Sequence, residues 1–195
     1  MILRKLEEKD ADGMLEWMKD EDIQKNFRFK ASDKTRADVL EFIHNAETIP
    51  IDGKSIHYAI ADENDEYLGT ISLKDINLSA KKAEYAISLR KKSQGHGIGT
   101  EATKEILRKA FFEFGLERVD LNVLSDNIKA IHVYEKCGFV NDKELETYLS
   151  LHGKYCGLKW YHILRKEYIE EFVCENSMRY TNPKGKVQQR KQRKV

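Results

Sequence analysis

Three glycines stand in the run Gln94-Gly95-His96-Gly97-Ile98-Gly99-Thr100, between two segments of different periodicity. In residues 83–89 apolar side chains at the odd positions alternate with Glu84, Ala86 and Ser88, as in a strand with two unlike faces. Over residues 98–115 apolar side chains recur about every four positions, which is typical of an amphipathic helix. Glycine allows positive φ and close approach of a ligand, and the first N–H groups of a helix bind anions. The junction therefore predicts a phosphate-binding site.

The spacing of the glycines separates the candidate phosphate ligands. A Walker loop requires Gly, four residues and then Gly-Lys-Ser/Thr, and a dinucleotide-binding turn requires Gly-x-Gly-x-x-Gly near the start of a βαβ unit. The run at 94–100 has neither spacing. A glycine-rich turn also serves plain packing of a helix on a strand, so a second segment is needed to decide.

The second segment is residues 127–139, which follow an apolar alternation at 119–123. Asn127 and Tyr134 are seven residues, or nearly two helical turns, apart, so they share one face of the predicted helix. Gly138 is placed to end that helix.

Both segments resemble one family. Gln94-x-x-Gly97-x-Gly99 resembles the pyrophosphate-binding signature of the GNAT superfamily of acyl-coenzyme A N-acyltransferases, and residues 127–139 resemble a later helix of that family. Residues 3–10 look like the opening of the branch that includes ribosomal-protein N-terminal and amino-sugar acetyltransferases. With residues 160–167, the resemblance extends over about residues 1–167.

The resemblance implies acetyl-coenzyme A (acetyl-CoA) as the cofactor and assigns residues to its parts. The residues that would bind the diphosphate are Gln94, Gly95, His96, Gly97, Ile98, Gly99 and Thr100. The extended arm would pair with the strand edge at Ile87, Ser88 and Leu89. The backbone N–H near Leu89 would face the thioester carbonyl. The later helix would lie beside the arm, through Asn127 and Ala130, with Tyr134 reaching the sulfur.

Acetyl transfer to an amine needs a base and an acid. The acceptor ammonium must lose its proton before attack, and Glu84 is the candidate base, directly or through water. An exposed or salt-bridged strand residue is the alternative for Glu84. Tyr134 is the candidate acid for the departing thiolate, and a core aromatic is the alternative there.

Three further polar residues receive structural interpretations. We expect His96 and His132 to be solvent-facing, and Cys137 to be a small buried side chain. The spacing of the three cysteines predicts neither a disulfide framework nor a metal site.

The chain is expected to form one acetyltransferase domain at residues 1–173, followed by a flexible basic tail at 174–195. Its charged N-terminus and lack of long apolar runs predict a cytoplasmic protein without a membrane span. Seven of the 34 basic residues and none of the 33 acidic residues follow residue 178, so residues 1–178 carry a charge of −6. The tail is favoured as a solvated extension over a nucleic-acid contact, because aromatic residues are almost absent there.

Helices interleave with strands along the chain, which predicts a three-layer α/β domain with a mixed, mostly antiparallel sheet flanked by helices. Strands are expected at 2–6, 56–62, 67–74, 83–89 and 118–123, with two more between 139 and 165. Helices are expected at 9–19, 33–45, 98–115 and 127–137, and Glu63-Asn64-Asp65 reads as a hairpin turn.

The leading functional hypothesis is direct acetyl transfer from acetyl-CoA to a primary amine of a small molecule, such as a nucleotide-linked amino sugar. A protein N-terminus and a polyamine are alternative acceptors, and a non-catalytic acyl-CoA sensor with a nucleic-acid-binding tail is an alternative of another class. The resemblance also implies a homodimer, although no segment identifies an interface.

Overall fold

In the computed structural model, the described residues are 1–27, 30–151 and 157–170. Seven strands form one sheet: β1 (Ile2–Arg4), β2 (Ile56–Ala61), β3 (Tyr67–Asn77), β4 (Lys82–Leu89), β5 (Arg118–Leu124), β6 (Val140–Asn141) and β7 (Leu158–Leu164). The α-helices are α1 (Ala11–Lys19), α2 (Glu21–Gln24), α3 (Arg36–Asn45), α4 (Ile98–Arg108), α5 (Ile128–Lys136) and α6 (Lys143–Leu151).

The sheet order is β1-β2-β3-β4-β5-β7-β6. Neighbouring strands run antiparallel except β4 and β5, which run parallel. The loop and helix α4 connect these two parallel strands, because a parallel pair needs a crossover. The expected mixed, mostly antiparallel sheet is confirmed.

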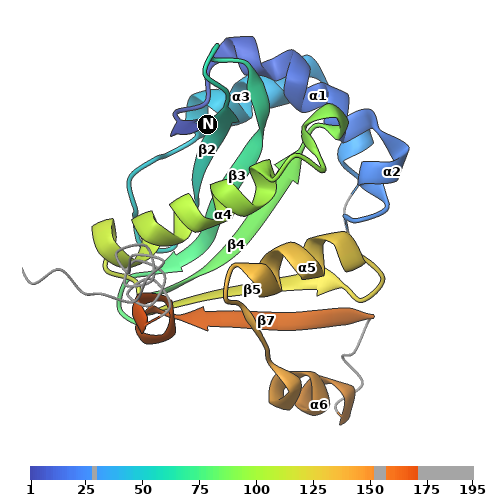
Figure 1. Cartoon of the computed structure of the whole chain (residues 1–195). Coiled ribbons are helices and arrows are strands. Elements are labelled where there is room, and N and C mark those ends of the chain that lie inside the picture. Colours follow the sequence, from blue (N-terminus) through green and yellow to red (C-terminus); the bar gives the residue numbers. More distant parts are fainter. Residues whose placement is uncertain (28–29, 152–156, 171–195) are drawn as a thin grey trace, which may run out of the picture.

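Helices cover both faces of the sheet (Figure 1). One core lies between the sheet and α4 and α5, and the other lies under α1 and α3, against β2 and β3. Trp17 of α1 belongs to the second core, where it stacks on Phe27 and donates a hydrogen bond from Nε1 to the hydroxyl of Tyr67 at 3.0 Å. The three layers follow from period-two strands that bury apolar side chains on both faces.

Most predicted elements are present, with instructive differences at their ends. The turn after β2 is confirmed, since Asp62 accepts from the backbone N–H groups of Asn64 and Glu66. The helix expected at 98–115 is α4 followed by a π-helical segment at Lys109–Glu113. Helix α6 was not expected between the two last strands, because none of its side chains is buried and its apolar residues mark no core stripe.

The expected tail and the expected end of the domain are not tested by the described residues. The basic tail at 174–195 lies outside the described residues, and the domain boundary at 173 stays a prediction. Within the described ranges, none of the helices combines the length and apolarity that a bilayer crossing requires.

A buried ion pair fastens β1 to the segment before α1. Asp10 is 1 % exposed, and both its oxygens accept from the guanidinium of Arg4, at 2.7 and 2.8 Å. Asp10 also accepts from the backbone N–H of Glu7. Its charge is therefore compensated entirely by groups of the first ten residues and held out of water.

Replacing Arg4 by Met leaves this carboxylate buried without its counter-charge, so the free energy of unfolding should fall by about 3 kcal/mol. The matched control is Arg36→Met, which breaks the exposed pair with Asp12 (3.3 Å) and should cost less than about 1 kcal/mol. Urea unfolding measures both, and equal losses would contradict this account of Arg4.

Candidate active site

The parallel strands β4 and β5 part soon after they begin. Their pairing covers Lys82, Ala83 and Glu84 of β4 and the facing residues 118–120 of β5. Within the described chain no pair joins the two strands beyond these positions. From Tyr85 onward the β5-facing edge of β4 is therefore open for an extended ligand to pair with.

The register with β3 shows which backbone groups lie on that open edge. The N–H of Arg90 donates to the carbonyl of Leu68 at 2.9 Å, so these two residues form a hydrogen-bonded antiparallel pair. Because such pairs alternate, Ile87 and Leu89 turn their N–H and C=O groups away from β3 and toward the gap. Ser88 faces Thr70 and turns its backbone groups to β3 instead. Leu89 thus has the backbone orientation that a donor to the thioester carbonyl requires.

The glycine run forms the turn from β4 into α4. Gly95 and Gly97 have φ of 82° and 81°, in the left-handed region that glycine adopts readily. A Cβ added at either position would meet no atom within 4 Å, so open space lies beside the backbone. Gly97 is the N-cap of α4, and the first helical hydrogen bond is from the N–H of Glu101 to its carbonyl. The preceding N–H groups at 98–100 therefore have no acceptor within the helix, and such groups beside open space suit an anion such as a diphosphate.

The other residues of the run are arranged around these amides. Gln94 donates from Nε2 to the carbonyl of Leu89 at 3.3 Å, which ties the loop to the end of β4. His96 is exposed, as expected. Gly99 packs near Leu89, because an added Cβ would lie 3.4 Å from the side chain of Leu89.

Helix α5 and its N-cap carry three of the residues predicted for the acyl donor, Asn127, Ala130 and Tyr134. Asn127 is the N-cap of α5, and its Oδ1 accepts from the N–H of Ala130 at 3.3 Å. This hydrogen bond gives Asn127 a local capping role that the sequence did not predict. His132 is exposed and Cys137 is buried, and both observations confirm the expectations.

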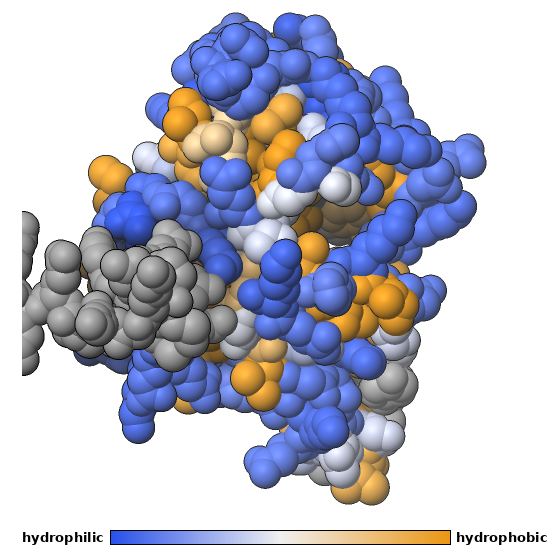
Figure 2. All heavy atoms as spheres, in the orientation of Figure 1, coloured by the Kyte–Doolittle hydropathy of each residue, from blue (hydrophilic) through white to orange (hydrophobic). Residues whose placement is uncertain are grey.

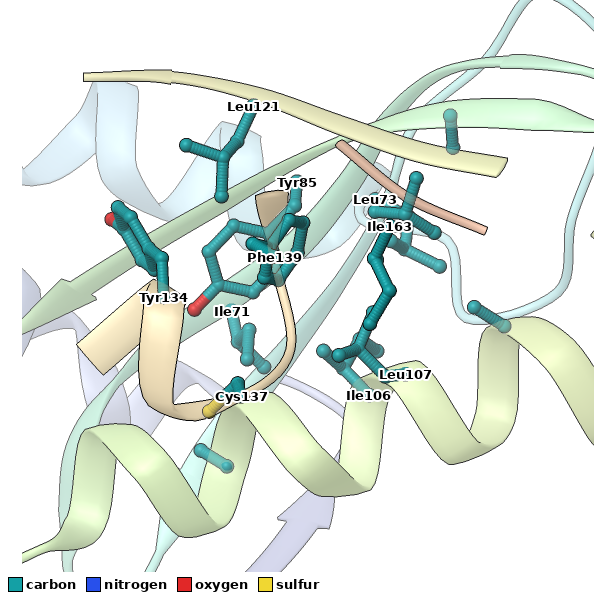
Figure 3. Close-up of a cluster of buried hydrophobic side chains, with 14 of the residues drawn as sticks. Ile71, Leu73, Tyr85, Ile106, Leu107, Leu121, Tyr134, Cys137, Phe139 and Ile163 are labelled. Atoms are coloured by element: carbon teal, nitrogen blue, oxygen red, sulfur yellow. The ribbon is translucent and has the colours of Figure 1, made fainter. Parts of the chain in front are cut away.

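Tyr134 is 8 % exposed, and its ring packs edge-on against Tyr85 with centroids 5.6 Å apart. Phe139 completes the aromatic cluster, and the hydroxyl of Tyr134 points away from Phe139 and Cys137 (Figure 3). Burial raises the pKa of Tyr134 well above its ordinary value, and the neighbouring Cys137 adds to the rise. The phenol therefore keeps its proton at neutral pH.

Between α5 and the end of β4 the surface is hollowed, with hydrophobic residues beside the opening (Figure 2). This hollow lies on the side of the sheet that α4 and α5 cover. Tyr134 belongs to the core on this side, and Ile87, Leu89 and Ile98 pack against it from the end of β4 and the start of α4. The structure thus brings together the residues predicted for the acyl donor.

Glu84 lies on the opposite face of the sheet. Successive strand residues point to opposite faces, and Ala83 and Tyr85 belong to the core under α4 and α5. The carboxylate of Glu84 accepts from Nζ of Lys74, on β3, at 2.5 Å. Glu84 and Tyr134 are therefore separated by the sheet, and the salt-bridged state that the sequence left open for Glu84 is observed.

A cleft of about 540 Å³ opens beside Glu84 on this second face. It is lined by Asp75, Lys82, Ala83, Glu84, Arg118, Asp120, Asp142, Leu145, Trp160 and Tyr161. Four of these residues are acidic and two are basic. Arg118 binds Asp120 at 2.6 Å and Asp142 at 3.2 Å. Burial raises the pKa of Asp142, but the N–H of Leu145 and Arg118 outweigh it and leave that pKa lowered.

Sequence reasoning missed Lys74, Asp120 and Asp142. The register explains why, since Glu84 lies opposite Lys74 on one side and Asp120 on the other. The side chains of Lys74 and Asp120 point to the same face as Glu84, and Asp142 follows β6, but only the pairing of distant segments brings these residues together.

The space beside Gly97 yields a direct test of the donor site. Gly97→Leu should weaken the binding of coenzyme A about tenfold or more, since the new side chain fills the open space beside the turn. Gly53→Leu is the matched control, because Gly53 has φ of 72° and open surroundings but lies outside the site. Calorimetry measures affinity, and equal weakening by both variants would contradict the assignment.

Known proteins are similar to this chain in sequence and in fold. Residues 1–140 match the model of the acetyltransferase (GNAT) domain family. The chain is 29% identical over 132 residues to spermidine N(1)-acetyltransferase of Vibrio cholerae, covering 68% of this chain and 75% of that protein. It is 32% identical over 106 residues to the spermidine N(1)-acetyltransferase of Escherichia coli K12, covering 54% and 57%.

The fold also has a close match among solved structures. The crystal structure of the Vibrio cholerae spermidine N-acetyltransferase with CoA and spermine superimposes with a TM-score of 0.69. The match covers 86% of this chain and 97% of that one, at 23% identity. The family match spans well over half of the chain and includes the glycine turn and α5. The chain therefore belongs to the GNAT acetyltransferase family and is an acetyl-CoA-dependent N-acetyltransferase.

Proposed function

We propose that this enzyme acetylates a primary amine of a polyamine. Sequence similarity to two spermidine acetyltransferases carries the proposal. The cleft beside Glu84 supports it, because four acidic residues line it against two basic ones and a polyamine is a multiple cation. The amino-sugar acceptor favoured by the sequence has no support from these relatives, so the polyamine alternative replaces it.

In this proposal the two reactants bind on opposite faces of the sheet. The acyl donor, when bound, supplies an acetyl thioester on the side of α4 and α5. The amine approaches from the cleft on the other face, and the two meet where β4 and β5 part. The open edge at Ile87 and Leu89 aligns the donor arm, and the N–H of Leu89 stabilises negative charge on the carbonyl oxygen.

Two proton transfers complete the proposed mechanism. Glu84 accepts a proton from the acceptor ammonium, through water, because only the neutral amine has a lone pair for attack. Tyr134 gives its proton to the sulfur as the carbon–sulfur bond breaks. Lys74 faces Glu84 as its counter-charge, so the carboxylate has a partner before the amine arrives.

Tyr134→Phe should lower kcat about 10²-fold and leave the KM for acetyl-CoA within about twofold, because only the proton donor is lost. The raised pKa of Tyr134 keeps this proton in place, so wild-type kcat should not fall through its ionisation between pH 7 and 9. Tyr58→Phe is the control, since that buried tyrosine lies outside both sites and its hydroxyl donates to the carbonyl of Thr48 at 2.6 Å. Steady-state kinetics test the role, and normal turnover of Tyr134→Phe would refute it.

Glu84→Gln should lower kcat/KM about 10²-fold at pH 7, and the loss should shrink toward pH 10, where more of the amine is already neutral. Glu117→Gln is the control, because its surface carboxylate pairs with Arg165 at 3.1 Å. The measurement is kcat/KM against pH. A loss independent of pH would argue against a base.

The substrate class is tested by coenzyme A release with spermidine, spermine, an amino sugar and a peptide with a free N-terminus. We expect the polyamines to give the highest kcat/KM, by about tenfold or more, since only they carry several ammonium groups. Preference for the peptide or the sugar would reject the polyamine proposal and leave the acetyltransferase assignment intact.

A further inference from the structure

Arg90 lies directly after β4, at the start of the segment that leads into the glycine turn. Its guanidinium is 15% exposed and is held from three directions. It donates to Glu16 of α1 at 3.0 Å, to Glu66 of the β2–β3 turn at 3.0 Å and to the carbonyl of Tyr67 at 3.0 Å. Figure 1 shows the loop after β4 beside α1.

The two lysines that follow also pair with carboxylates of the protein. Lys91 lies 2.9 Å from Asp22 of α2 and 3.8 Å from Asp20, and Lys92 pairs with Glu66. Both lysine side chains are half or more exposed, whereas Arg90 is largely enclosed. A basic triplet before a phosphate loop would ordinarily be read as phosphate ligands, but these cations are matched with carboxylates of the protein.

We propose that Arg90 is a positioning residue, which fixes the glycine turn through Glu16 and the carbonyl of Tyr67 and does not itself bind the donor phosphates. The inference rests on the assignment of residues 94–100 to the diphosphate. It is independent of which amine the enzyme acetylates.

The physical need for such an anchor comes from the glycines. Gly95 and Gly97 have many accessible backbone conformations, and a ligand that orders them must offset the lost entropy. Arg90 holds the chain at the point where the turn leaves the sheet, and its own N–H also donates to the carbonyl of Leu68. Its rigid planar fork can hold two carboxylates and a carbonyl together, which a lysine ammonium does with less geometric control.

Glu16→Gln separates positioning from direct phosphate binding, because the two models predict opposite outcomes. If Arg90 positions the loop, Glu16→Gln and Arg90→Met should each weaken coenzyme A binding, by about tenfold for Arg90→Met, and the double variant should be no weaker than Arg90→Met. If Arg90 binds the phosphates, Glu16→Gln frees it, and affinity should stay the same or increase. Calorimetry with coenzyme A gives the result.

A second measurement uses the protein without any ligand. Amide hydrogen exchange at residues 91–97 should become faster in both single variants, and Arg90→Lys should restore part of the protection. Arg108→Met is the control, since Arg108 is also held by two glutamates, Glu105 and Glu113, at the far end of α4. It should change neither affinity nor exchange at the turn. Unchanged exchange in Arg90→Met, or unchanged affinity in Glu16→Gln, would overturn the proposal.

These outcomes remain separate from a failure of the proposed function. Loss of the polyamine preference leaves the coenzyme A affinities of these variants unaffected. A diphosphate bound elsewhere would show itself through Gly97→Leu with normal affinity, whatever the behaviour of Arg90.

Discussion

The separation of β4 from β5 after three paired positions is the constraint on which the site depends. Parallel strands ordinarily continue their hydrogen bonds, and an edge left open inside a sheet leaves donors and acceptors unused. Here the open edge begins at Tyr85 and ends at the glycine turn, so one continuous stretch of backbone is available for the arm and the diphosphate that we assign to the donor. Because α4 and α5 pack on one face only, the two sides of this opening have different surroundings.

The candidate acid and the candidate base lie on these two different sides of the sheet. Tyr134 is enclosed by aromatic rings on the face of α4 and α5, and burial keeps its proton on. Glu84 lies on the other face, in a polar cleft with Lys74 as its ionic partner. A carboxylate and a phenol side by side would perturb one another, whereas two faces of one sheet allow one apolar and one polar environment.

The local patterns of the chain predict the elements around the glycine turn well and the contacts of Glu84 poorly. The glycine spacing and the apolar stripe of α4 are local features, and so is the interval from Asn127 to Tyr134. The contacts of Glu84 depend on the register between distant strands. The hydrogen bond from Arg90 to Glu16 joins residues 74 positions apart. The capping bond of Asn127 and the unburied helix α6 were missed for another reason, since neither is marked by a buried apolar period.

The most direct measurement is amide hydrogen exchange of β4 with and without coenzyme A. The N–H groups of Ile87 and Leu89 should become protected when coenzyme A binds, because they face the gap. The N–H of Ser88, which faces β3, should be protected in both states. Binding without added protection at Ile87 and Leu89 would contradict the claim that the open edge of β4 holds the donor.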